Sequence, residues 1–184
     1  KTQKKRSRTY VKPKKPTESS GQSASATVNK PVKAIPCVNQ NGLGLYIHIP
    51  WCEKKCPYCD FNAHALPVTH QLDPVLEMRY LKQLLLDLDQ DIETFGITAE
   101  LTSLFFGGGT PSLLSSRGLG YLLAEIDNRL PITSTTECSL EANPGSSDQA
   151  KFVGYRAAGI NRLSIGVQSF SDPALQRLGR THTR

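Results

Sequence analysis

Short apolar segments alternate with helical patterns four times along this 184-residue chain, and this alternation restricts the fold more than any other feature. The segments are rich in β-branched and aromatic side chains, which favour strands, and they cover residues 45–49, 101–106, 136–141 and 162–167. Each is followed by a helical stretch. Successive strand-then-helix units favour a parallel sheet with right-handed crossover connections. We therefore predict an α/β fold.

The helical stretches carry start and stop signals. The longest begins at Asp73 and Pro74, a capping residue followed by a residue suited to the first turn. Its apolar residues recur every three or four positions, and Gly96 is placed to end it. The remaining helices are expected over residues 119–130, over residues 148–158 and from residue 172 onwards.

Polar and chemically reactive residues follow the predicted strands. They are Cys52, Cys56 and Cys59 after the first strand, Gly107 to Gly109 after the second, Glu141 at the third and Gln168 at the fourth. Parallel strands bring their carboxyl ends to the same edge of a sheet, and ligands bind at that edge. We therefore expect these residues to surround one mouth.

The three cysteines have the spacing Cys-x-x-x-Cys-x-x-Cys, which predicts a metal centre. Iron–sulfur clusters are usually held by four thiolates, so three leave one corner of a four-iron cluster open to a non-protein ligand. The alternatives are a zinc site in which His64 completes a Cys3His set, and three unliganded buried thiols. The charged residues between the cysteines disfavour buried thiols.

The second strand runs directly into the sequence Gly107-Gly108-Gly109-Thr110-Pro111. Consecutive glycines allow a ligand to approach the backbone closely. The pattern lacks the third glycine of a dinucleotide fingerprint and the Gly-Lys-Ser/Thr of a phosphate-binding loop. It predicts either a tight structural turn or, beside the cysteines, a surface for a polar cosubstrate.

The positive net charge of +6 is concentrated at one end of the chain. Residues 1–36 hold 10 of the 22 Lys and Arg and one of the 16 Asp and Glu, so the remaining 12 basic and 15 acidic residues have a net charge of −3. Residues 1–40 have few large apolar side chains, which predicts a disordered basic tail. Its charge suits phosphate groups, but a solvated leader is the favoured interpretation, and nucleic acid is not an expected partner.

The length suits one further domain, residues 41–184, which is short of the roughly 250 residues of a full α/β barrel. We therefore expect the N-terminal part of an incomplete barrel, with an exposed sheet edge and marginal stability. No apolar run is long enough for a membrane span or a secretory signal, so a cytoplasmic protein is expected. Cys138 is interpreted as a buried apolar residue, and Cys37 receives no role.

Taken together and in order, the motifs resemble the radical SAM superfamily. Within it they are similar to the oxygen-independent coproporphyrinogen III oxidase-like family, in the haem chaperone branch named HemW. The resemblance covers residues from about 43 to 184 and rests on five segments: residues 46–52, the cysteine loop, residues 106–112, residues 140–144 and residues 166–170.

This resemblance implies a radical SAM-type (β/α) barrel that holds a 4Fe-4S cluster on Cys52, Cys56 and Cys59. S-adenosylmethionine would chelate the open iron, and one-electron reduction would break a bond at its sulfonium. The residues implied to contact this cosubstrate are Tyr46, Gly108, Gly109, Thr110, Glu141, Gln168 and Arg180.

One departure from the family pattern bears on function. The oxidases carry a further cysteine two residues after the third, whereas this chain has Phe61 there. The resemblance therefore implies a haem chaperone that binds haem and passes it to an acceptor protein, with a flavodoxin-like or similar electron donor. The alternative is an oxygen-independent coproporphyrinogen III oxidase, an oxidoreductase of coproporphyrinogen dehydrogenase type. A zinc-binding nucleic-acid module is a distant third.

Overall fold

The computed structural model describes residues 42–67, 72–144 and 148–184. The expected basic tail, residues 1–40, and Cys37 lie outside the described residues, so the division of the chain near residue 40 stays a prediction. No helix within the described residues has the length and apolar character needed to cross a membrane.

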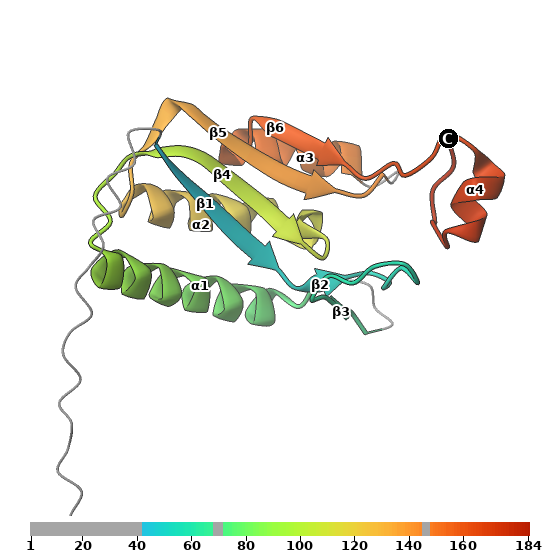
Figure 1. Cartoon of the computed structure of the whole chain (residues 1–184), viewed down its shortest axis with the longest axis horizontal. Helices are drawn as coiled ribbons and strands as arrows, with labels where there is room; N and C mark the ends of the chain where they lie inside the picture. Colours follow the sequence, from blue (N-terminus) through green and yellow to red (C-terminus); the bar gives the residue numbers. More distant parts are fainter. Residues whose placement is uncertain (1–41, 68–71, 145–147) are drawn as a thin grey trace, which may run out of the picture. The chain divides into compact units, whose positions relative to one another are not determined.

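A four-stranded sheet forms the centre of the structure (Figure 1). Its strands are β1 (Leu43–Ile49), β4 (Leu101–Gly108), β5 (Ile132–Ala142) and β6 (Arg162–Ile165). They lie in the order β1-β4-β5-β6, and every neighbouring pair is parallel. The predicted α/β fold with a parallel sheet is thus confirmed.

Helices connect these strands. They are α1 (Pro74–Phe95), α2 (Ser116–Asp127), α3 (Asp148–Ala158) and α4 (Asp172–Arg177), with a short 3-10 helix, η1 (Pro111–Leu113), after β4. Figure 1 shows α1 and α2 beneath the sheet and α3 behind β6, and α2 packs against both α1 and α3. Between sheet and helices lies a core of aliphatic side chains with Phe106 and Tyr155.

The boundaries of α1 follow from its end residues. The Asp73 carboxylate accepts a hydrogen bond from the Leu76 amide at 2.8 Å, and Pro74 occupies the first turn. Gly96 adopts a left-handed conformation, and its amide donates to the Ile92 carbonyl. These two caps satisfy backbone groups that a helix end leaves unpaired, so the predicted start and stop of α1 are confirmed.

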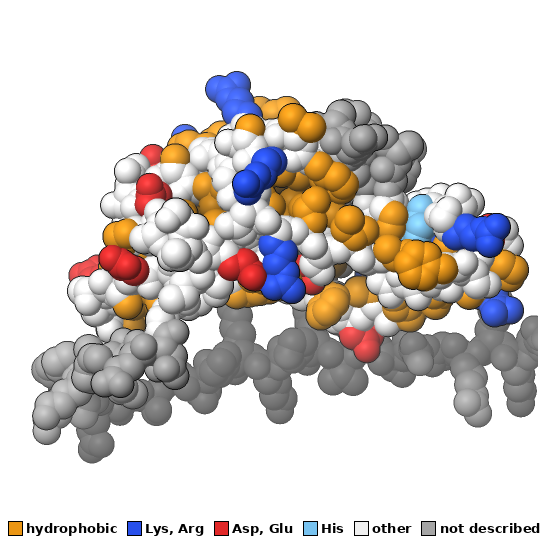
Figure 2. Space-filling model, turned by 90° about the horizontal axis from the view of Figure 1, so that it is seen from above, with side chains coloured by type: hydrophobic (Ala, Val, Ile, Leu, Met, Phe, Trp, Pro, Cys, Tyr) orange, Lys and Arg blue, Asp and Glu red, His pale blue; other side chains and the backbone are white. Residues whose placement is uncertain are grey.

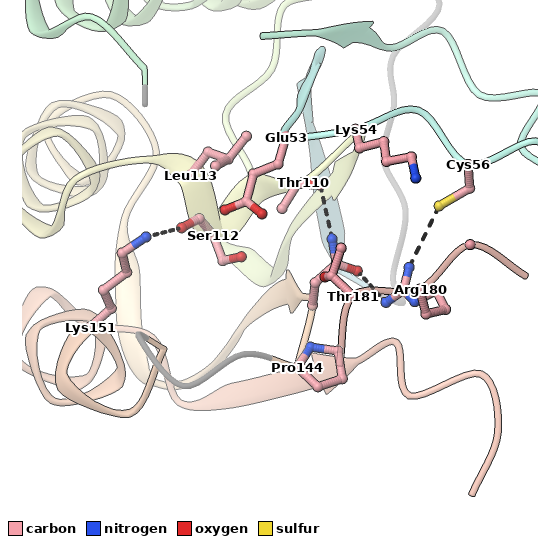
Figure 3. A pocket seen from close by; sticks show the side chains of 12 residues that line it. Glu53, Lys54, Cys56, Thr110, Ser112, Leu113, Pro144, Lys151, Arg180 and Thr181 are labelled. Carbon is pink, nitrogen blue, oxygen red and sulfur yellow. Dashed lines mark hydrogen bonds between the residues drawn. The ribbon is translucent and has the colours of Figure 1, made fainter. Parts of the chain in front are cut away.

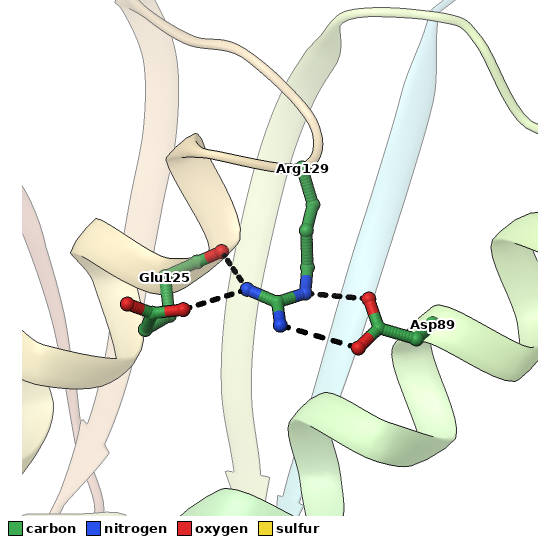
Figure 4. Close-up of polar contacts among 3 residues, drawn as sticks. All are labelled: Asp89, Glu125 and Arg129. Atoms are coloured by element: carbon green, nitrogen blue, oxygen red, sulfur yellow. Dashed lines mark hydrogen bonds and ion pairs between the residues drawn. The ribbon is translucent and has the colours of Figure 1, made fainter.

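Two side-chain clusters tie α1 to α2. Arg129, just after α2, makes a bidentate ion pair with Asp89 of α1 and also pairs with Glu125 at 2.8 Å (Figure 4). Near the start of α1, the buried Glu77 carboxylate accepts hydrogen bonds from the Ser115 amide at 3.0 Å and the Ser115 hydroxyl at 2.7 Å. The relative position of the two helices is therefore fixed near both ends of their contact.

The structure corrects the sequence prediction for the last strand. Residues 162–167 were predicted to be extended, but β6 ends at Ile165. The chain turns there because the Val167 amide bonds the nearby Ile165 carbonyl, and Gln168 has a left-handed backbone with φ of 67°. This turn ends the ladder with β5 two residues early.

Part of the sheet is not covered by helices. Three large hydrophobic side chains of the strands are exposed, namely Tyr46, Phe105 and Ile165, and the edge strand β6 has only Leu163 partly buried. Figure 2, which views the molecule from above Figure 1, shows hydrophobic side chains at the surface among Lys, Arg, Asp and Glu. An exposed edge was predicted, and the β6 edge fits that prediction; the marginal stability that was also predicted is untested.

Candidate functional site

A small pair of parallel strands holds the cysteine loop closed. Strand β2 (Trp51–Cys52) pairs with β3 (His64–Ala65). The His64 amide donates to the Pro50 carbonyl at 2.7 Å, and the Leu66 amide to the Cys52 carbonyl at 2.8 Å. Strands of two residues have no recognisable periodicity, so this pair could not be predicted from sequence. The pairing brings the two ends of the cysteine loop together.

One cavity of about 280 Å³ gathers nearly all of the predicted site residues. Its lining includes Cys52, Cys56, Cys59, Gly108, Gly109, Thr110, Glu141, Gln168 and Arg180. They come from the carboxyl ends of all four strands of the sheet and from the segment after α4. The predicted mouth therefore exists as a single cavity, while the binding roles of these residues stay predictions.

Tyr46 is the predicted site residue that does not line this cavity. It lies on β1, stacks on Phe105 with ring centroids 6.3 Å apart, and hydrogen-bonds His48 Nδ1 through its hydroxyl at 3.0 Å. His48 Nε2 in turn contacts the Asn62 carbonyl at 2.8 Å. Partial burial, and then the charge of Glu141, raise the pKa of Tyr46. Tyr46 is therefore linked to the cysteine loop through His48.

The three cysteines differ in their surroundings. Cys52 is buried, whereas Cys56 and Cys59 are half-buried. Burial raises the pKa of the Cys52 thiol, and a hydrogen bond from the Thr110 hydroxyl opposes this effect. Among the described residues, no three His, Cys, Asp or Glu side chains are grouped to hold a single metal ion. The cavity that the three cysteines line does not include His64 of the Cys3His alternative.

The backbone at the end of β4 approaches the cysteine loop. The Gly109 amide donates to the Ile49 carbonyl at 2.8 Å, and the Thr110 amide to the Trp51 carbonyl at 2.7 Å. These donors are therefore engaged by β1 and β2. A ligand's ammonium group needs acceptors, so the interaction predicted for Gly108 and Gly109 requires their carbonyl groups.

Arg180 reaches the cavity from the segment after α4. Its Nη2 donates to Asn143 Oδ1 at 2.9 Å and to the Gly166 carbonyl at 2.8 Å, while Nη1 contacts Cys56 Sγ at 3.7 Å. Its Nε is buried and finds no hydrogen-bond partner among the described residues. A buried donor without a partner costs free energy, so this atom points to a ligand that supplies an acceptor.

A smaller hollow of about 110 Å³ adjoins the main cavity, with which it shares Lys54, Cys56, Thr110, Asn143 and Arg180 (Figure 3). On its far side, Lys151 Nζ approaches the Ser112 carbonyl at 3.5 Å. Asn143 lies between the two spaces. Sequence reasoning missed this residue because it stands in Ala-Asn-Pro-Gly, a pattern typical of an ordinary turn.

The donor set fits the groups that the motifs imply. Three thiols line one cavity, which suits an iron–sulfur cluster with one open corner. The buried Nε of Arg180 and the Glu141 carboxylate can meet the carboxylate and ammonium of an amino-acid-like ligand, because the two charges are complementary to those of such a ligand.

Comparison with known proteins identifies the family. The model of the radical SAM superfamily matches residues 46–184, which includes the whole cavity lining. The chain belongs to the radical SAM superfamily. Within the superfamily it is similar to the heme chaperone HemW of Haemophilus influenzae, with 50% identity over 143 residues, 76% of this chain and 36% of that protein.

Two further comparisons involve relatives that carry different names. The heme chaperone HemW of Escherichia coli is 51% identical over 140 residues, 76% of this chain and 35% of that protein. The solved structure of the Escherichia coli coproporphyrinogen III oxidase (HemN), described as a radical SAM enzyme, superimposes with a TM-score of 0.66 at 28% identity, over 77% of this chain and 31% of that one. The chain thus spans about a third of the length of these relatives.

Proposed function

We propose that this radical SAM chain holds a 4Fe-4S cluster on Cys52, Cys56 and Cys59 and presents its open iron to S-adenosylmethionine. The superfamily match and the shared cavity lining support this proposal. When bound, the cluster would supply the electron that reduces the sulfonium of S-adenosylmethionine. The β2–β3 pair closes the loop that carries the thiols.

The remaining side chains would orient the cosubstrate. Arg180 offers a buried Nε to its carboxylate, and Glu141 offers an acceptor to its ammonium group. The left-handed backbone of Gln168 turns the chain at the mouth, where its side chain lines the cavity. Tyr46 would act from outside the lining, through His48 and the loop.

We further propose a haem chaperone function, in which the protein binds haem and passes it to an acceptor protein in the cytoplasm. The observation that carries this proposal is Phe61, which lines the cavity in the position where the related oxidases have a fourth cysteine. Its side chain is 65% exposed and apolar, which does not suit ligation or proton transfer. Identities of 50% and 51% to two proteins named heme chaperone HemW agree with it.

The alternative function is an oxygen-independent coproporphyrinogen III oxidase. The structural likeness to the Escherichia coli enzyme, with a TM-score of 0.66, favours keeping this alternative. Both functions use the same cluster and cosubstrate, and a flavodoxin-like electron donor would serve either. The fold does not separate them because function resides in the site.

Turnover of coproporphyrinogen III distinguishes the two functions. The protein is reconstituted anaerobically with iron and sulfide and supplied with S-adenosylmethionine, a reductant and coproporphyrinogen III, with the Escherichia coli oxidase as the positive control. Haem binding is measured by absorption titration in parallel. We expect bound haem and no decarboxylated product. Product formed over many turnovers would replace the chaperone function with the oxidase function.

A further inference from the structure

Asn143 connects two residues of the cavity through both ends of its side-chain amide. It lies directly after β5, and its Nδ2 donates to Thr110 Oγ1 at 3.2 Å while its Oδ1 accepts from Arg180 Nη2 at 2.9 Å. Figure 3 shows this chain of hydrogen bonds running from Thr110 to Arg180 and on to Cys56. Residues from three separate segments are thereby joined at one point.

The chemistry of Arg180 determines which atoms donate and which accept in this series of hydrogen bonds. A guanidinium group only donates hydrogen bonds, so the amide must turn its oxygen toward Arg180 and its NH2 toward Thr110. The Thr110 hydroxyl oxygen therefore accepts from Asn143, and its own proton is directed elsewhere. Reversing the amide would place two donors against each other at Arg180.

One end of this series of hydrogen bonds contacts a cysteine, and the other end lies next to the segment that carries another. Arg180 Nη1 contacts Cys56 Sγ at 3.7 Å. At the other end, Thr110 is held beside Cys52 by the hydrogen bond of its amide to the neighbouring Trp51 carbonyl, at 2.7 Å. Arg180 therefore brings a donor to the sulfur of Cys56, and Asn143 ties that donor to Thr110.

We propose that Asn143, anchored on the Thr110 hydroxyl, is a positioning residue that holds the Arg180 guanidinium as a hydrogen-bond donor to the sulfur atom of Cys56. This inference rests on the proposed function, because this sulfur belongs to a proposed cluster ligand. Among the described residues, the Asn143 side chain bonds Thr110 and Arg180, so it acts on the sulfur through these two neighbours.

The consequence is electrochemical. Hydrogen bonds to ligating sulfurs are among the factors that set the reduction potential of an iron–sulfur cluster. Donors to sulfur stabilise the reduced, more negative state, so their loss lowers the potential. Loss of Asn143 also leaves Arg180 Nη2 with the Gly166 carbonyl as its remaining acceptor, so the guanidinium is held less firmly and cosubstrate binding weakens. Removal of such supporting partners typically costs about 10-fold or more in affinity or activity.

The test compares Asn143→Ala with Asn161→Ala in the reconstituted protein. Asn161 is a matched control because it also uses both amide ends, accepting from the Cys138 amide and donating to the Thr136 carbonyl, each at 2.8 Å, yet it does not line the cavity. The reduction potential is measured by electron paramagnetic resonance titration, and the dissociation constant of S-adenosylmethionine from the change in the same signal.

We expect a more negative potential and about 10-fold weaker S-adenosylmethionine binding for Asn143→Ala, with both values unchanged in Asn161→Ala. Equal values in Asn143→Ala and the unmodified protein would overturn the inference, as would the same shifts in Asn161→Ala. Failure of the unmodified protein to assemble a cluster would instead contradict the proposed function.

A second pair of variants tests the same series of hydrogen bonds if Asn143→Ala does not fold. Thr110→Val removes the hydroxyl at nearly constant volume, and Thr110→Ser keeps it. We expect Thr110→Val to lower the reduction potential and Thr110→Ser to restore it. A potential that is the same in both variants would contradict a hydrogen-bonding role for the hydroxyl.

Discussion

Gly108 illustrates how single residues shape the cavity. Its φ is 113°, and an added Cβ would lie 2.7 Å from the His48 ring and 2.9 Å from the Ile49 carbonyl oxygen. Both its conformation and its surroundings therefore require glycine. The His48 ring it packs against is the link between Tyr46 and the cysteine loop.

The variant Gly108→Ala is expected to lose about 1–3 kcal/mol of unfolding free energy, because a left-handed alanine is strained and must displace His48. S-adenosylmethionine binding should weaken as well. Gly120→Ala is the control, since a Cβ on Gly120 of α2 would lie at an ordinary 3.7 Å from Ala158 of α3. Urea denaturation measures both variants. Equal stability of Gly108→Ala and the unmodified protein would contradict this account.

Residue types were more predictable from sequence than residue contacts. The three cysteines, the glycines and Glu141 follow strands, and strand ends can be located from sequence. Asn143 could not be found in this way, because its role depends on Thr110 and Arg180, which lie 33 and 37 residues away. The turn signal at Asn143 describes its backbone correctly and is silent on its side chain.

At the scale of elements, α1 and α2 are joined by charge as well as by packing. The Arg129 guanidinium holds the pKa of the Asp89 carboxyl below its ordinary value, first through hydrogen bonding and then through its charge. Folded Asp89 therefore binds its proton less readily than unfolded Asp89. This linkage stabilises the fold above the ordinary carboxyl pKa of about 3.9, and the stabilisation is lost as pH falls through the lowered value.

We accordingly expect Asp89→Asn to lower the unfolding free energy at pH 7 by about 1 kcal/mol or less, because the Asp89 side chain is 47% exposed and its ion pair is screened. The difference should shrink below pH 4 and with added salt. Asp91→Asn, on the same helix, is the control. Denaturation midpoints across pH test this expectation, and a difference that persists at pH 2 would contradict it.

Element boundaries were predictable where a single residue determines them. Asp73 and Gly96 mark the ends of α1 because capping depends on local backbone groups. The end of β6 was mispredicted by two residues because Gly166 and Val167 look extended in sequence, whereas the turn depends on the left-handed Gln168. The β2–β3 pair depends on contact between segments 13 residues apart and has no local signal.

At the scale of the whole molecule, the parallel sheet explains how the site forms. Cys56 and Arg180 are 124 residues apart in sequence and meet because each strand delivers its carboxyl end to the same edge. The fold class and the position of the mouth therefore followed from the strand–helix alternation. The binding sites of the proposed haem, acceptor protein and electron donor did not follow from this alternation, because none of the motifs after the strands is specific to them.

The measurement that tests the central claim most directly is the iron and sulfide content of the anaerobically reconstituted protein, with spectra recorded before and after S-adenosylmethionine is added. We predict about four irons per chain and a signal that changes with the cosubstrate. Cys52→Ala, Cys56→Ala and Cys59→Ala should each lose the intact cluster, and Cys138→Ala, which removes a buried thiol outside the cavity, should keep it. A full complement of iron in any of the first three variants, or a signal indifferent to S-adenosylmethionine, would contradict the account.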